Sequence, residues 1–280
     1  MKPAAFAYAK AQSLDHAVEL LGRQDARVLA GGQSLIATLN MRLDAPQMLV
    51  DINGIASLDG IVLKGDHLEI GAMVRHAGAM QSIVIAQHAP LIANALPHIG
   101  HPAIRNRGTI GGSVALADPA AELPACLLAL AGEVDISGPN GRRTVKADDF
   151  FRGLFETALG SQDVLTAIRV PAASALMRYG FAELARRHGD YAIVGLAACA
   201  RVDFSEIRLV FFGVGATPVR ARGAEATLVN GGFAQADAAV ATLADDLDPD
   251  DDLQASGKVK KHLAGVLLRR VARQLQEPRA

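Results

Sequence analysis

The sequence predicts an α+β fold built in at least two parts. Helical and extended patterns alternate from the N-terminus to about Pro171. After residues 171–174, three β-type segments follow one another without a helix between them, and two helical stretches come last. The chain has 280 residues, half of them hydrophobic, which is enough for a large core and more than one subdomain.

In the first part, Ser13 is a good N-cap, and the apolar residues after it recur at helical spacing as far as Gly22. A second helix is expected over 34–43, directly after a Gly-Gly pair. Residues 83–100 also read as helical, with breaks at Pro90 and Pro97. Short strands are expected over 26–32, 48–52 and 67–74.

A further helix is expected to start at Asp118, because an Asp cap followed by Pro119 is a good start signal. This helix should lead into a strand over 133–138. A hairpin and loop over 140–151 and a strand over 163–171, closed by Pro171, complete the first part.

The second part opens with three expected strands of an antiparallel sheet, over 179–187, 192–202 and 206–215. The acidic run 245–253 between the two helical stretches is expected to be a solvated loop with no special role. The last helix, 258–275, is expected to pack on the sheet through one apolar stripe: Val259, Leu263, Leu267 and Val271.

Composition excludes several classes of function. The net charge of −1 gives no general attraction to nucleic acid or to an anionic membrane. No apolar segment approaches the roughly 20 residues of a membrane span. The apolar stretch at the N-terminus is short and is broken by Lys10, so a secretory signal is rejected. The sequence therefore predicts a soluble, cytoplasmic protein.

Metal sites and several familiar catalytic motifs are also disfavoured. Cys126 and Cys199 lie in apolar runs outside any C-x-x-C, so both are expected to be buried and inert. His98 and His101 lack a nearby third ligand and are interpreted as loop-lining residues. The chain has no P-loop, no Rossmann fingerprint and no G-x-S-x-G. We name no catalytic residue and no metal ligand.

Two Gly-Gly pairs remain, in "AGGQSL" (30–35) and "TIGGS" (109–113). A Gly-Gly turn between a strand and a helix leaves backbone N–H groups unshielded, which suits phosphate. Two such loops would suit a dinucleotide pyrophosphate. On spacing alone, however, two unrelated tight turns are the favoured interpretation.

The wider sequence resembles the FAD-binding medium subunit of molybdenum hydroxylases, the family of the carbon monoxide dehydrogenase medium subunit and the xanthine dehydrogenase flavin domain. The resemblance rests on both loops and on "LVDINGIASLDGI", "RNRGTIGGSVALADPAAELPA", "RRHGDYAIVGLAA" and "GVGATPVRA", in family order along nearly the whole chain. It implies a two-part FAD-binding α/β domain of the PCMH/vanillyl-alcohol-oxidase type over 1–173, with subdomains of about 1–55 and 56–173. A C-terminal domain with a small antiparallel sheet and helices would occupy 174–280.

The resemblance also implies the FAD-binding residues. The two loops would wrap the pyrophosphate, Glu122 and more weakly Asp118 would accept hydrogen bonds from FAD hydroxyls, Tyr191 would lie beside the isoalloxazine ring, and two apolar residues would line its pocket. Core packing would equally explain these apolar residues, and Glu122 and Tyr191 also have ordinary structural explanations. The full set is Ala30, Gly31, Gly32, Gln33, Ser34, Leu35, Ile99, Thr109, Ile110, Gly111, Gly112, Ser113, Asp118, Glu122, Leu165 and Tyr191.

Three positions depart from the family pattern. Ser113 stands where many relatives have Asn or Asp, and Leu116 where many have His. Glu183 falls at or beside a position where a lysine is frequent near the ring. These departures leave the FAD assignment standing, but they make detailed transfer of redox behaviour unsafe.

By this resemblance, the chain is an oxidoreductase subunit that passes electrons from iron–sulfur clusters through FAD to an external acceptor. The implied partners are a small subunit with [2Fe-2S] clusters and a large subunit with molybdenum and a pterin cofactor, in a dimer of heterotrimers. Two alternatives stay open: a stand-alone FAD oxidoreductase with its own substrate pocket, and a flavin-free assembly scaffold. The substrate and the electron acceptor are not specified by this chain.

Overall fold

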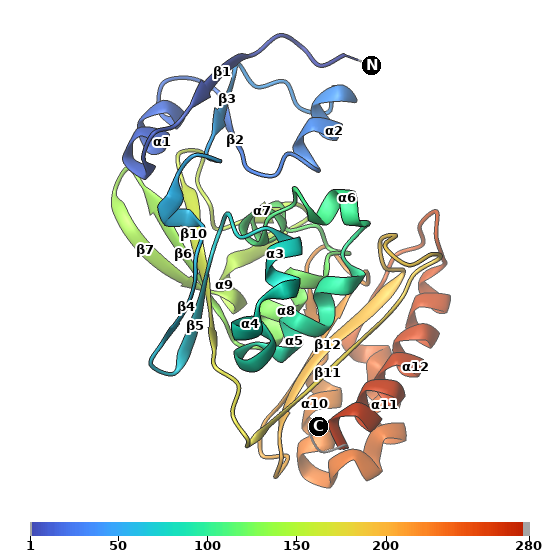
Figure 1. Ribbon diagram of the computed structural model, residues 1–280. Coiled ribbons are helices and arrows are strands. Elements are labelled where there is room, and N and C mark those ends of the chain that lie inside the picture. The colour runs from blue at the N-terminus through green and yellow to red at the C-terminus, as the bar shows by residue number, and fades with distance from the viewer. Residues whose placement is uncertain (1, 277–280) are drawn as a thin grey trace.

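The computed structural model describes residues 2–276, so Met1 and residues 277–280, at the ends of the predicted domains, lie outside it. Within these residues the chain forms a three-, a five- and a four-stranded sheet and a two-stranded hairpin. In Figure 1, a layer of short helices lies between the five-stranded sheet and the C-terminal sheet, and the last helices cover the far side of the latter. The mixed α+β class is confirmed.

The N-terminal sheet is parallel, with strand order β1-β3-β2. The predicted first helix is confirmed: Ser13 Oγ accepts the His16 N–H at 3.1 Å, and the helix ends before Gly22. The second predicted helix also follows the first Gly-Gly pair. The elements are β1 (Ala7–Lys10), α1 (Leu14–Leu21), β2 (Ala26–Leu29), α2 (Leu35–Asn40) and β3 (Met48–Asp51).

The five-stranded sheet is antiparallel, with order β4-β5-β10-β6-β7. Strand β4 was not predicted. It is a short, mostly exposed edge strand, so its sequence shows no clear alternation of apolar and polar residues. The pairing of β10 with β6 shifts register between Leu165 and Ala167. The strands are β4 (Ile61–Lys64), β5 (His67–Gly71), β6 (Glu133–Gly138), β7 (Gly141–Lys146) and β10 (Val164–Pro171).

Short helices cover one side of this sheet. The breaks expected at Pro90 and Pro97 are confirmed. The helix expected from Asp118 starts only at Glu122, because the Asp118 carboxylate accepts the Ala120 N–H at 2.9 Å and forms a turn instead of a cap. These elements are η1 (Ala56–Leu58), α3 (His76–Gln81), α4 (Ile83–His88), α5 (Pro90–Ala95), η2 (Leu96–His98), α6 (Pro102–Arg105), α7 (Ile110–Leu116), α8 (Glu122–Ala129), α9 (Ala147–Phe150), β8 (Phe151–Gly153) and β9 (Glu156–Thr157).

The C-terminal sheet is antiparallel in the order β11-β12-β13-β14, as expected for its first three strands. Phe212 and Ala197 face the helices of the N-terminal part, whereas Phe211 and Leu196 face the final helices. Both faces are covered, which explains the unbroken apolar run of β12. The elements are β11 (Met177–Leu184), β12 (Val194–Arg201), β13 (Ile207–Phe212), β14 (Val219–Arg220), α10 (Arg222–Gly231), η3 (Gly232–Gln235), α11 (Ala236–Asp246) and α12 (Gly257–Gln276).

For the C-terminal part, the expectation for the acidic run is wrong, and that for the last helix is confirmed except at one residue. The acidic run is not featureless: Asp246 accepts the Gly223 and Ala224 N–H groups that start α10, and Asp252 pairs with the buried Lys260 at 2.7 Å. Helix α12 packs on the C-terminal sheet as expected, with Leu267 and Val271 fully buried and Leu263 partly buried against the same core. Val259 is the exception at 46% exposed, and the buried face also includes Ala264, Leu268 and Leu275.

No helix among the described residues is both long and apolar enough to cross a lipid bilayer.

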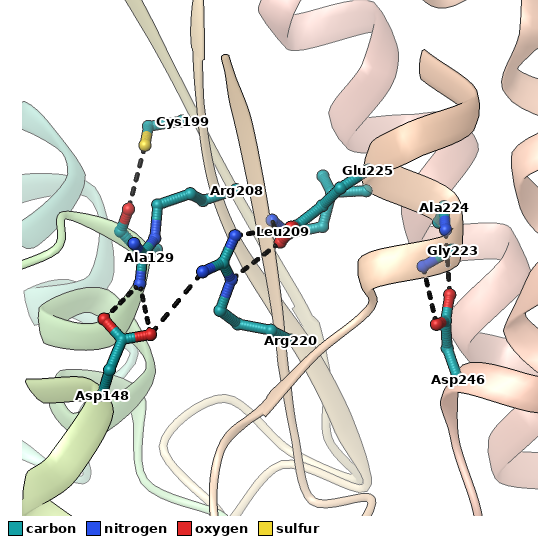
Figure 2. Close-up of polar contacts among 10 residues, drawn as sticks. All are labelled: Ala129, Asp148, Cys199, Arg208, Leu209, Arg220, Gly223, Ala224, Glu225 and Asp246. Carbon is teal, nitrogen blue, oxygen red and sulfur yellow. Dashed lines mark hydrogen bonds and ion pairs between the residues drawn. The ribbon is translucent and has the colours of Figure 1, made fainter. Parts of the chain in front are cut away.

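Ion pairs join the C-terminal sheet to the N-terminal part (Figure 2). The Asp148 carboxylate of α9 accepts hydrogen bonds from Arg208 Nη2 at 2.8 and 3.1 Å and lies 3.6 Å from Arg220 Nη1. Arg220 also binds Glu225 at 2.6 Å, and the Cys199 thiol donates to the Ala129 carbonyl. These contacts fix one sheet against the α8–α9 region.

Replacing Asp148 with Asn is expected to lower the free energy of unfolding by about 1–2 kcal/mol, because the mostly buried Arg208 guanidinium loses its counter-charge. Urea denaturation followed by circular dichroism measures the change. Asp149→Asn is the control, since the neighbouring Asp149 is exposed. An equal loss in both variants would contradict the role of the ion pair.

Candidate functional site

The two Gly-Gly loops meet at one cavity of about 590 Å³. Every residue predicted for the site lines this cavity except Ile110. The structure therefore brings together segments from the N-terminal sheet, the second loop, α8, β10 and the loop before β12. The lining residues from the prediction are Ala30, Gly31, Gly32, Gln33, Ser34, Leu35, Ile99, Thr109, Gly111, Gly112, Ser113, Asp118, Glu122, Leu165 and Tyr191.

The first loop, residues 30–35, has the unshielded backbone donors that the sequence suggested. Gly32 adopts φ +72°, a conformation that side chains other than glycine rarely allow. Among residues 2–276, no acceptor lies within hydrogen-bonding geometry of the Gly32, Gln33 or Ser34 N–H groups. The loop therefore presents a row of free donors, a binding feature for an anion.

The second loop differs from the expectation. The Ile110 and Gly111 N–H groups donate to the Val74 and Ala72 carbonyls, both at 2.9 Å, so neither is free for a ligand. The Ile110 side chain is fully buried in the core. These N–H groups are occupied because the loop is hydrogen-bonded to the segment that follows β5, and the sequence gives no sign of this contact. Its contribution to the cavity is close backbone approach and the Ser113 hydroxyl.

The two loops are in direct backbone contact. A Cβ on Gly31 would lie 2.4 Å from the Arg107 carbonyl oxygen, so only glycine permits this approach. Asn53 donates to the Ala30 carbonyl at 2.9 Å, and the Arg75 guanidinium bridges the Asn53 side chain to the Arg107 carbonyl. Asn53 and Arg75 thereby hold one loop against the other.

Thr109 caps the helix that follows the second loop. Its Oγ1 accepts the Gly112 N–H at 3.1 Å, and the residue is 2% exposed. Thr109→Val keeps the shape and removes the acceptor, so the apoprotein is expected to lose about 1 kcal/mol of unfolding free energy. Thermal denaturation measures this loss, and Thr109→Ser, which keeps the hydroxyl, should restore most of it. A Thr109→Val protein as stable as the unaltered chain would show that the cap does not contribute to stability.

The acidic side of the cavity is formed by Asp118 and Glu122. The pKa of Glu122 is raised to about 8, mainly by burial and also by the charges of Glu183 and Asp118, while a backbone hydrogen bond and the nearby His98 act in the opposite direction. Burial also raises the pKa of Asp118. Tyr191 is 59% exposed at the cavity, and partial burial of its hydroxyl raises its pKa. These side chains provide donors and acceptors for hydroxyl groups.

An apolar wall lies beside this acidic side. Leu165 and Ile99 are buried yet reach the cavity, and the register shift after Leu165 is a β-bulge of the kind that re-aims a side chain. Phe155, between β8 and β9, adopts φ +55° and is 55% exposed at the cavity. A planar aromatic ligand would find apolar contacts here.

The sequence did not point to His76, Asn53, Arg75 or Phe155. His76 lines the cavity and is 4% exposed, and burial lowers its pKa to about 4. Its ring lies against Gly108 and the Thr109 backbone, and neither ring nitrogen makes a hydrogen bond with good geometry to the described residues. A lone histidine in an apolar stretch carries no spacing signal, so only the fold identifies it.

Two positions that depart from the family pattern are placed clearly. Leu116 lines the cavity. The Glu183 side chain is 4% exposed, and its Oε1 lies 3.2 Å from His98 Nδ1. His98, interpreted from the sequence as a loop-lining residue, thus faces Glu183, and the hydrogen bond to this carboxylate raises the pKa of His98. No group of three or more His, Cys, Asp or Glu side chains in the described chain is arranged to hold a metal ion, and both cysteines are buried, as expected.

Comparison with known proteins gives a consistent result. Residues 4–173 match the family described as the FAD binding domain in molybdopterin dehydrogenase, and residues 179–275 match the CO dehydrogenase flavoprotein C-terminal domain. The nicotine 6-hydroxylase medium subunit of Paenarthrobacter nicotinovorans is 37% identical, over 96% of this chain and 97% of its own length.

Solved structures agree with the sequence matches. Carbon monoxide dehydrogenase from Hydrogenophaga pseudoflava, in a form lacking the Mo-pyranopterin moiety, superimposes with a TM-score of 0.96 at 36% identity and covers 100% of both chains. Quinoline 2-oxidoreductase from Pseudomonas putida 86 gives a TM-score of 0.92 at 33% identity, covering 99% of this chain and 98% of that one.

Proposed function

Since the chain belongs to the family of FAD-binding medium subunits of molybdenum hydroxylases, we propose that it holds FAD in the cavity between the glycine loops and transfers electrons there. The electrons would come from iron–sulfur clusters of a partner subunit and leave to an external acceptor. The observation that carries the proposal is the row of free N–H donors at Gly32, Gln33 and Ser34, which faces the same cavity as the apolar wall and the acidic side chains.

The cavity fits FAD in both size and chemistry. Its volume of about 590 Å³ is in the range of cofactor pockets. A pyrophosphate needs donors and no side chain in the way, which the first loop offers.

We propose the contacts that the family resemblance implies and that the chemistry of the lining residues supports. The first loop and the Ser113 hydroxyl would hold the pyrophosphate. Glu122 and Asp118 would hydrogen-bond FAD hydroxyls, and Tyr191, with Leu165 and Ile99, would contact the isoalloxazine ring. When bound, FAD supplies the ability to store two electrons and to release them singly or as a pair. The task of the chain is to position the flavin, exclude water from its apolar face and set the charge around it.

The proposed partners are a small subunit that carries [2Fe-2S] clusters and a large subunit that carries molybdenum and a pterin cofactor. A relative from Paenarthrobacter nicotinovorans is named as a subunit of a dehydrogenase complex, and one matched structure is named a Cu,Mo-CO dehydrogenase. These names support an assembly of several chains, for which we propose a dimer of heterotrimers. Substrate oxidation would take place on the large subunit.

An absorption spectrum of the purified chain, before and after addition of FAD, tests the cofactor proposal. The expected result is a flavin spectrum at one FAD per chain that survives gel filtration. A colourless chain that takes up no FAD would contradict the proposal and favour a flavin-free scaffold.

Affinity purification from the native source, followed by mass spectrometry, tests the partners. We expect two co-purifying subunits, one with iron and acid-labile sulfide and one with molybdenum. A chain that purifies alone with FAD and oxidises a small donor by itself would contradict the electron-transfer proposal and favour a stand-alone oxidoreductase.

A further inference from the structure

A line of titratable side chains runs from the cavity to the protein surface. Glu122, at the start of α8, lines the cavity and is 7% exposed. Glu183, on β11, has a side chain that is 4% exposed, and its Oε1 lies 3.2 Å from His98 Nδ1. The His98 side chain is one-third exposed, and its ring contacts that of the exposed His188 at a centroid distance of 5.7 Å. The line therefore ends in solvent.

One oxygen in this line has no partner. Glu183 Oε2 is buried and makes no hydrogen bond with any described residue. Burying a carboxylate oxygen without a hydrogen-bond partner costs folding free energy, so such an oxygen indicates a functional role or a bound ligand or water. The charge of Glu183 acts on Glu122, and that of Glu122 acts on His98, so the three side chains form one electrostatic cluster.

Two members of this cluster have raised pKa values. Burial raises the pKa of Glu122 to about 8, and the hydrogen bond to Glu183 raises the pKa of His98. Asp118 adds a negative charge beside Glu122. Burial raises the pKa values of the other nearby groups, Tyr191 and Cys126, so they stay neutral.

We propose that His98, Glu183 and Glu122 form the path by which protons move between solvent and the FAD cavity when the flavin changes its oxidation state. Two-electron reduction of a flavin takes up one or two protons, and reoxidation releases the same number. This inference rests on the proposed function, in which the electrons come from iron–sulfur clusters that bring no protons with them.

The path balances at each step. Glu122 gives its proton to the cavity. His98 then passes a proton to the Glu183 carboxylate, Glu183 passes it on to Glu122, and His98 is reprotonated from solvent. After each cycle all three groups return to their starting state. Reoxidation runs the same sequence in reverse. Histidine at the solvent end suits this task, because its charge changes near physiological pH.

The test uses the full chain loaded with FAD and reduced in weakly buffered solution by the methyl viologen radical, which donates electrons without releasing protons. A stopped-flow instrument follows flavin bleaching and, with a pH indicator, proton uptake. Glu183→Gln and His98→Ala are expected to slow proton uptake by about tenfold or more relative to the unaltered chain. Added imidazole should restore the rate in His98→Ala, which a merely structural role would not predict.

His67→Ala is the matched control. His67 Nδ1 lies 2.6 Å from the Asp66 carboxylate, so it forms the same kind of pair, but on the β4–β5 hairpin and outside the cavity. This variant should take up protons at the unaltered rate. Unaltered rates in both Glu183→Gln and His98→Ala, at full FAD occupancy, would overturn the path and leave the FAD assignment intact. Failure of the unaltered chain to take up FAD would overturn both.

Discussion

Gly32→Val is expected to abolish FAD binding while leaving the protein folded. Gly32 adopts φ +72°, which a β-branched residue tolerates poorly, so the first loop must rearrange and its free N–H groups must turn away. A Cβ at this position would meet only side-chain atoms of Leu29 and Ile36, at 3.2 and 3.3 Å, which have room to shift. We expect an affinity loss of about 100-fold or more, equivalent to roughly 3 kcal/mol, and a loss of stability of about 1–3 kcal/mol.

Fluorescence titration with FAD measures the affinity, and thermal denaturation of the apoprotein measures the stability. Gly65→Val is the matched control, because Gly65 has a similar φ of +61° with no atom within 4 Å of an added Cβ, and it lies in the β4–β5 turn outside the cavity. It should bear the same backbone strain and keep FAD. Retention of FAD by Gly32→Val would show that the first loop is not the pyrophosphate site.

Gly112 is a less selective place for this test. A Cβ there would lie 2.7 Å from Thr109 Oγ1, so a valine would also break the cap of α7. Loss of FAD in that variant would combine two causes. A substitution at Gly32 changes the first loop and leaves the cap of α7 intact, so it tests the first loop alone.

Glu122→Gln is expected to stabilise the apoprotein at pH 8 by a few kcal/mol. The pKa of Glu122 is raised from 4.5 to about 8 by burial, so between these values the folded state holds a proton that the unfolded state has released. Stability from this group is therefore complete below pH 4.5 and is lost as the pH rises through 8. Each pKa unit corresponds to about 1.4 kcal/mol, which sets the order of magnitude.

Glutamine has a similar shape and does not ionise, so the variant should lack this loss. Urea denaturation at several values from pH 5 to pH 8.5 measures the two stability curves, which should diverge as the pH rises. Glu206→Gln, at an exposed position, should follow the unaltered chain throughout. Parallel curves for Glu122→Gln and the unaltered chain would show that the buried carboxyl does not titrate in this window.

Much of the fold follows from local patterns. The Ser13 cap, the helix breaks at Pro90 and Pro97, and the strand that ends at Pro171 each depend on residues close together in the chain. The apolar run over 192–202 similarly predicts the strand β12. Interactions over a few residues determine these elements, so the sequence reveals them without knowledge of the rest of the molecule.

The site was predictable as a set of residues but not as an arrangement. Glycine loops and acidic motifs mark it in the sequence, and the structure gathers them around one cavity. The sequence could not show that backbone N–H groups of the second loop donate to the Ala72 and Val74 carbonyls, or that Ile110 is buried in the core.

The sequence by itself determined most of the secondary structure of this protein, because helix caps, helix breaks and strand patterns depend on local hydrogen bonding and on side-chain periodicity. The family and the segments expected at the cavity came from the resemblance of several motifs in family order. Only the tertiary structure decided which groups in those segments remain free. The pairing of His98 with Glu183 and the contact of Gly31 with Arg107 each join residues far apart in the chain. Packing sets such contacts, and no local pattern encodes them.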